Sequence, residues 1–129
     1  AAGISLTHRS VADGFWVITG TKKDGSLSKD IKLATQSSST LVVLMGMSKL
    51  AEIANLFFAA GKTETPVGII QNGTTESEKI VIGNISNIVE LATKNQLSAP
   101  AIIVIGEVVN TSTQLQTIAE NVNHDLVLN

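Results

Sequence analysis

The chain has 129 residues, the size of one domain with one hydrophobic core. It contains no cysteine, which excludes disulfides, thiolate zinc sites and cysteine nucleophiles. The net charge of −2 gives no electrostatic basis for nucleic-acid binding, and no apolar run approaches the ~18 residues of a transmembrane helix, so neither nucleic acid nor membrane is an expected partner.

Short apolar, β-branched runs alternate along the chain with helical patterns. The runs predict strands at 15–20, 40–46, 66–71, 79–83 and 100–109. Apolar residues spaced by three or four predict helices at 29–35, 48–61, 86–95 and 112–122. Ser48 and Ser86 are the expected N-caps of two of them, and Gly61 is an expected C-terminal stop. The alternation predicts an α/β fold, with about five strands in a mixed sheet and helices on its faces. No linker divides the chain, so residues 1–129 are expected to form one domain.

Three of the expected strands end in a glycine-bearing loop, in the segments LMGMS, IIQNGTT and IVIGEVV. Ligands of open α/β sheets gather beyond the carboxyl ends of strands, where glycine lets the backbone approach them closely. Each glycine alone is read more readily as part of a turn. Two such loops from neighbouring strands favour a binding site. Met47, which follows one of these glycines, is expected to fill the core.

Most catalytic constellations are missing from the sequence. His8 and His124 are far apart, so no metal site is expected, and no Walker, Gly-x-Gly-x-x-Gly or Gly-x-Ser-x-Gly motif occurs. A polar cluster of Thr7, His8 and Arg9 interrupts an apolar start. It is either a surface loop or a site that recognises carboxylates, for which the arginine fork is suited.

The proportion of charged residues is low, at 16% against roughly 25% in an ordinary soluble domain. Either another chain or domain covers some apolar surface, or this is a small aliphatic-rich domain. The first residues lack a basic region followed by an apolar one, so no signal peptide is expected.

Several segments together resemble one enzyme family. In order, they are GISLTHR, VITG with a following KDG, TLVVLMGMSKLAEIA, TPVGIIQNGTT, VIGNISNI and SAPAIIVIGEVV. This series, over roughly residues 2 to 109, resembles uroporphyrinogen-III C-methyltransferases, which are tetrapyrrole methylases that use S-adenosylmethionine. Two positions depart from the family's pattern: Ser5 stands where proline is usual, and Thr21 where histidine is often found.

The resemblance implies a function and a site. The activity would be methylation of uroporphyrinogen III on two ring carbons to give precorrin-2, on the way to sirohaem and cobalamin. The cofactor-binding residues would be Met45, Gly46, Asn72, Gly73 and Thr74. We expect the tetrapyrrole substrate to meet Thr7, His8 and Arg9.

The resemblance also concerns the rest of the enzyme. Family members are about twice this long, and their first half carries the Gly-rich cofactor loop and the residues usually assigned to catalysis. This chain therefore looks like the C-terminal domain, inactive alone, of a cytoplasmic homodimer. The alternatives are a methylase of a later corrinoid intermediate and a non-catalytic ligand-binding or dimerisation module.

Overall fold

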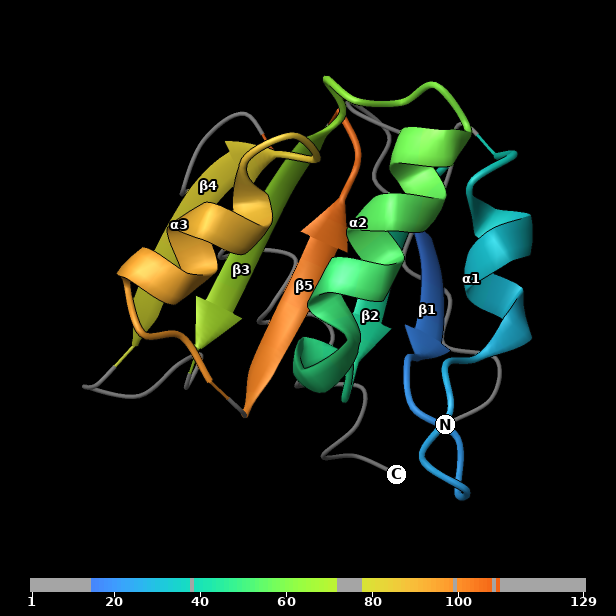
Figure 1. Ribbon diagram of the computed structural model, residues 1–129, viewed down its shortest axis with the longest axis horizontal. Helices are drawn as coiled ribbons and strands as arrows, with labels where there is room; N and C mark the ends of the chain where they lie inside the picture. Colours follow the sequence, from blue (N-terminus) through green and yellow to red (C-terminus); the bar gives the residue numbers. More distant parts are fainter. Residues whose placement is uncertain (1–14, 38, 72–77, 99, 108, 110–129) are drawn as a thin grey trace.

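A five-stranded mixed sheet forms the centre of the protein (Figure 1). The computed structural model describes residues 15–37, 39–71, 78–98, 100–107 and 109. The strands are β1 (Phe15–Thr19), β2 (Thr40–Leu44), β3 (Pro66–Gln71), β4 (Lys79–Asn84) and β5 (Ala101–Ile105). Their order is β1-β2-β5-β3-β4, with β1 and β2 parallel and every other neighbouring pair antiparallel. The predicted α/β fold, with about five strands in a mixed sheet, is confirmed.

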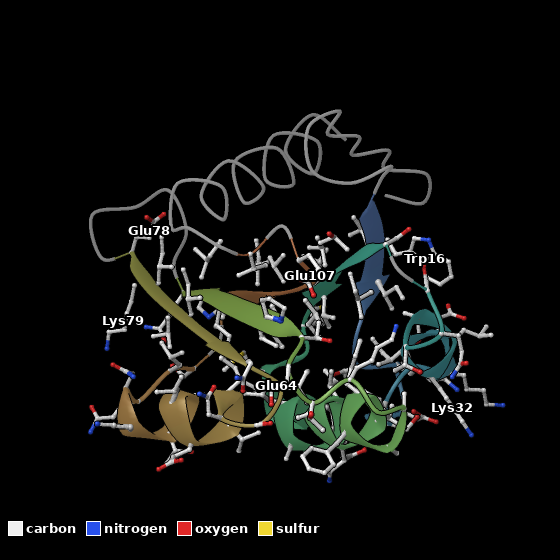
Figure 2. The ribbon with its side chains drawn as sticks, turned by 90° about the horizontal axis from the view of Figure 1, so that it is seen from above. Trp16, Lys32, Glu64, Glu78, Lys79 and Glu107 are labelled. Atoms are coloured by element: carbon white, nitrogen blue, oxygen red, sulfur yellow. The ribbon has the colours of Figure 1, made fainter. Side chains whose placement is uncertain are left out.

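The helices of the described residues lie on one face of the sheet (Figure 2). They are α1 (Lys29–Ala34), the 3-10 turn η1 (Met47–Lys49), α2 (Leu50–Ala59) and α3 (Ile88–Lys94). The helix predicted at 112–122 lies outside the described residues.

The start of α2 differs from the prediction. Ser48 is not its N-cap, because the backbone N–H of Lys49 donates to the carbonyl of Gly46 at 3.0 Å and tightens this segment into η1. The predicted stop at Gly61 is confirmed. This residue has a φ of 79°, and the N–H of Lys62 after it turns back to the carbonyl of Phe57 at 3.0 Å.

The start of α3 also differs. Ser86 donates its hydroxyl to the carbonyl of Thr63 at 2.9 Å, and Asn87 takes the N-cap position. The side chains of Asn84 and Asn87 each accept from the other's backbone N–H, at 3.1 and 2.8 Å. Ile88 and Ala92 form the buried face of this helix, whereas Val89 is 36% exposed.

The core lies between the sheet and these helices. Strand side chains on this face include Val43, Ile69 and Ile103, which are fully buried in one cluster with Ile53 of α2 and Ile88 of α3. Side chains alternate along a strand, so their neighbours point to the other face. Three of those neighbours are also fully buried: Val42, Ile70 and Val104. The central strands are thus buried on both faces, as their unbroken apolar runs predict.

Strand direction decides which loops meet. β2 and β3 are both antiparallel to β5, which lies between them. Hence β1, β2 and β3 end, and β5 begins, at one edge of the sheet, the carboxyl edge. Leu44 and Gln71, the last residues of β2 and β3, lie at this edge, whereas Gly106 follows β5 at the opposite edge. Gly106 also follows the end of a strand, as predicted, but it lies away from the other two glycine segments because β5 runs the other way.

Candidate functional site

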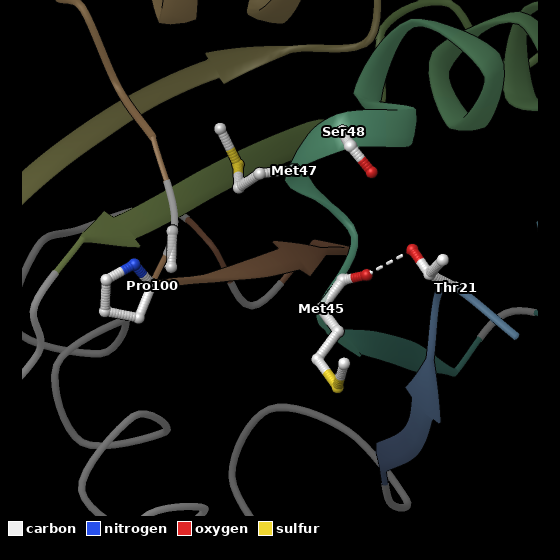
Figure 3. A pocket seen from close by; sticks show the side chains of 6 residues that line it. Thr21, Met45, Met47, Ser48 and Pro100 are labelled. Carbon is white, nitrogen blue, oxygen red and sulfur yellow. Dashed lines mark hydrogen bonds between the residues drawn. The ribbon is translucent and has the colours of Figure 1, made fainter. Parts of the chain in front are cut away.

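A pocket of about 410 Å³ opens at the carboxyl edge of the sheet. Figure 3 shows it between the end of β1, the loop that follows β2, and the residue that precedes β5. Its lining comprises Thr21, Met45, Met47, Ser48, Pro100 and Ala101. The lining is mostly apolar and includes no charged side chain among the described residues. Such a wall suits an uncharged, partly aromatic ligand group.

Met45 is the most unusual residue of this pocket. It follows β2 directly, its φ is 54°, and its side chain is 70% exposed. Left-handed backbone costs a non-glycine residue roughly 1–2 kcal/mol, and an exposed thioether gains little from the core. The Thr21 hydroxyl donates to the Met45 carbonyl at 2.6 Å and fixes this conformation. An unfavourable backbone that presents an apolar side chain at a pocket is typical of a binding residue.

The next residue, Gly46, is buried and faces the core. A Cβ atom there would lie 2.5 Å from Cγ1 of Val43 and 3.3 Å from Cδ1 of Ile103. Packing therefore explains the absence of a side chain at this position. Contact of the Gly46 backbone with a ligand stays a prediction.

The loops after β1 and β2 are held together by their backbones. The N–H of Gly20 donates to the carbonyl of Leu44 at 2.7 Å, and its own carbonyl accepts from the N–H of Ser28 at 2.8 Å. Beyond Gly20, the chain turns through a short hairpin in which Thr21 bridges Leu27. Asp24 at its tip accepts from the Ser26 hydroxyl, and this bond, with the Ser26 backbone N–H, lowers the pKa of the Asp24 carboxyl. The hairpin gives Thr21 a defined position beside the pocket.

The remaining wall joins the pocket to the core and to β3. Met47 is half-buried against the core cluster, as expected, and it also lines the pocket, which was not expected. Gln71, the last residue of β3, accepts from the N–H of Ser98 at 2.8 Å through its side chain. This bond ties the segment before β5 to the end of β3.

Of the predicted site residues, only Met45 and Gly46 fall within the described part of the chain. The others are outside it: Asn72, Gly73, Thr74, Thr7, His8 and Arg9. Within that part, no cluster of histidine, aspartate and glutamate is suited to a metal ion, and no helix has the length and apolar character to cross a membrane. The sequence reasoning missed Thr21 and Pro100 as pocket residues. Thr21 was noted only as a departure from the family's pattern, because a hydroxyl that binds a backbone carbonyl leaves no motif in the sequence, and no motif marks Pro100.

Comparison with known sequences gives the family. The profile of the tetrapyrrole (corrin/porphyrin) methylases matches residues 1–89, more than half of the chain. The chain belongs to the tetrapyrrole methylases. The resemblance seen in the sequence segments is thereby confirmed.

Two curated relatives are longer than this chain. The chain is 40% identical over 111 residues to the uroporphyrinogen-III C-methyltransferase of Methanocaldococcus jannaschii, covering 84% of this chain and 46% of that protein. It is 36% identical over 115 residues to the siroheme synthase of Chromobacterium violaceum, covering 88% of this chain and 24% of that protein. This tetrapyrrole methylase chain thus spans less than half the length of both relatives.

Solved structures agree on the fold. The uroporphyrin-III C-methyl transferase of Thermus thermophilus, complexed with S-adenyl homocysteine, matches with a TM-score of 0.66 at 29% identity. The match covers 82% of this chain and 47% of that one. A cobalt precorrin-4 methyltransferase matches with a TM-score of 0.66 at 19% identity, which shows a shared fold alone.

Proposed function

We propose that this chain is the C-terminal domain of an S-adenosylmethionine-dependent methyltransferase that converts uroporphyrinogen III to precorrin-2. The observation that carries the proposal is the exposed, left-handed Met45 at the mouth of an apolar pocket. The M. jannaschii relative bears this activity in its name, and the T. thermophilus structure contains the demethylated cofactor. These similarities support the reaction class.

The residues of the pocket fit part of the cofactor. A wall of Met45, Met47 and Pro100 matches a flat, uncharged adenosyl group, and about 410 Å³ is within the size range of small-molecule sites. The pocket has no charged side chain among the described residues that would hold the amino-acid end. We therefore assign Met45 and Gly46 to the adenosyl side, together with Asn72, Gly73 and Thr74. When bound, the cofactor supplies an electrophilic methyl group for an electron-rich pyrrole carbon.

The role of this domain is then to bind and orient the cofactor and the tetrapyrrole and to exclude water from them. Met45 and Met47 remove water from one side of the ligand, and the Thr21 bond keeps Met45 in place. Thr7, His8 and Arg9 are assigned to the carboxylates of the tetrapyrrole, since an arginine fork pairs with carboxylates. In this account the rest of the site and the catalytic residues come from an N-terminal half, and the enzyme is a cytoplasmic homodimer.

The test is turnover by the whole enzyme that contains this chain. Uroporphyrinogen III and S-adenosylmethionine are supplied, and the product is identified by mass and absorbance. The expected product carries two added methyl groups and the spectrum of precorrin-2. Turnover only of a later corrinoid intermediate would replace this substrate with that one. Absence of methyl transfer to any tetrapyrrole, with the enzyme folded, would leave a non-catalytic binding or dimerisation role.

A further inference from the structure

We propose that Thr21 is a positioning residue that sets the affinity of this pocket by holding the Met45 carbonyl. The inference rests on the proposed function, because it concerns the same cofactor pocket. It starts from three facts about one small region. Thr21 lines the pocket, its hydroxyl lies 2.6 Å from the Met45 carbonyl oxygen, and Met45 has a left-handed backbone.

The hydroxyl is itself held in place by the backbone around it. The bridge between Thr21 and Leu27, with the bond from the N–H of Lys22 to the carbonyl of Ser26 at 2.8 Å, closes the hairpin. The bond from Gly20 to Leu44 aligns the hairpin with the end of β2. The backbone that carries the donor is therefore preorganised, and only the side-chain rotamer has to be fixed when the hydroxyl bonds to the carbonyl.

The conformation of Met45 depends on this bond, because left-handed backbone is intrinsically unfavourable and an exposed side chain has few contacts to stabilise it. Without the hydroxyl, water would bind the carbonyl, and the left-handed backbone of Met45 would lose one of the contacts that stabilise it. The Met45 side chain would then sample positions away from the pocket. A ligand that needs it in place would bind only the fraction of molecules in the competent arrangement, so its apparent affinity would fall.

The experiment measures the affinity of the whole enzyme for S-adenosylhomocysteine by calorimetric titration. Thr21→Val keeps the shape and removes the donor, and Thr21→Ser keeps the donor and removes the methyl group. We expect Thr21→Val to weaken binding by about threefold to tenfold, the range for one net hydrogen bond, and Thr21→Ser to bind within about twofold of the wild type. In turnover, KM for S-adenosylmethionine should rise in Thr21→Val while kcat stays the same.

Thr35 provides a matched control. Its hydroxyl also donates to a backbone carbonyl, that of Lys32 at 2.7 Å, but at the end of α1 and outside the pocket lining. Thr35→Val should lower the melting temperature and leave the affinity for S-adenosylhomocysteine unchanged. If Thr21→Val does not fold, Thr21→Ala removes the same donor and replaces it in the comparison.

The outcomes separate two failures. A wild-type enzyme that does not bind S-adenosylhomocysteine overturns the proposed function and this inference with it. A wild type that binds, with Thr21→Val binding equally well, overturns this inference alone. A serine variant that binds as weakly as the valine variant also overturns it, because restoring the hydroxyl would then fail to restore the affinity.

Discussion

Gly20 and Gly46, after the ends of β1 and β2, bring their backbones into direct contact. A Cβ atom on Gly20 would lie 2.9 Å from the Cα of Gly46, closer than such atoms approach in proteins. This contact lets the loops of two parallel strands converge on one pocket, with Thr21 on one loop and Met45 on the other. The geometry of the site is thus set by backbone packing before any ligand is considered.

Substitution of Gly46 by alanine should destabilise the fold through crowding. The added Cβ would lie 2.5 Å from Cγ1 of Val43, within a fully buried part of the core, while the φ of −115° suits any residue. Overpacking of this kind costs roughly 1–3 kcal/mol in the free energy of unfolding, which urea denaturation would measure.

The control for this prediction is the double variant Gly46→Ala with Val43→Ala. Val43→Ala alone removes the clashing methyl group and leaves a cavity. The two changes should therefore compensate each other, and their combined cost should be smaller than the sum of the single costs. Simple additivity would show that crowding against Val43 is not the cause.

Ser26 should control the acidity of Asp24. The Ser26 hydroxyl lies 2.6 Å from the Asp24 carboxylate and is the main reason that its pKa is below the usual 3.8. Ser26→Ala should raise this pKa toward 3.8, as followed by NMR titration of the carboxyl carbon. Lys22→Ala should raise it less, because the Lys22 charge is a smaller cause. An equal or larger effect of Lys22→Ala would contradict this order.

The same shift fixes the sign of a pH dependence. The folded pKa of Asp24 is lower than the unfolded one, so the folded state favours the ionised carboxylate. Its contribution to stability is present above the unfolded pKa of about 3.8 and is lost as pH falls through the folded pKa. Ser26→Ala should bring the folded and unfolded pKa values of Asp24 closer together. The free energy of unfolding should then fall less between neutral and acid pH in this variant than in the wild type.

Met45 should show opposite effects on binding and on stability. In the whole enzyme, Met45→Ala should weaken S-adenosylhomocysteine binding by roughly 1–3 kcal/mol through lost apolar contact. Met45→Gly should weaken binding similarly. Its free energy of unfolding should nevertheless be about 1 kcal/mol higher than that of Met45→Ala, because glycine adopts a φ of 54° without strain. Calorimetry and chemical denaturation measure the two quantities. Undiminished affinity in both folded variants would remove Met45 from the site.

Strand positions could be predicted from the sequence because buried strands are continuous apolar runs, as in Thr40–Leu44. The direction of Ala101–Ile105 could not be predicted, since a run of aliphatic residues has no feature that distinguishes one strand direction from the other. Because this strand is antiparallel to both of its neighbours, Gly106 lies at the opposite edge of the sheet. Met45 was predicted as a site residue from the family resemblance. Thr21 was not predicted as a pocket residue, because its hydrogen bond joins positions 24 residues apart and ends on a backbone atom, which every residue has.

The chain should self-associate in solution. Its described surface carries large apolar side chains, with Trp16 42%, Leu33 62% and Phe58 56% exposed. Few charges compete with them, as only 16% of the residues are charged. Sedimentation equilibrium at micromolar concentration should therefore give a mass above the 13.5 kDa of one chain. A single species of monomer mass would count against association and against the proposed homodimer.

The isolated chain should fold cooperatively and yet bind S-adenosylmethionine only weakly. Ile53, Ile69, Ile88 and Ile103 are fully buried within one cluster, and burial of each contributes roughly 1.5–3 kcal/mol, so the core does not depend on a second domain. Binding must overcome several kcal/mol of lost translational and rotational freedom. One open apolar wall does not offset that loss. We therefore expect a single sharp thermal transition by circular dichroism, and a calorimetric Kd no tighter than roughly millimolar, about −4 kcal/mol. A micromolar Kd would show that this domain completes the pocket alone, and the proposal that an N-terminal half supplies the rest of the site would have to be abandoned.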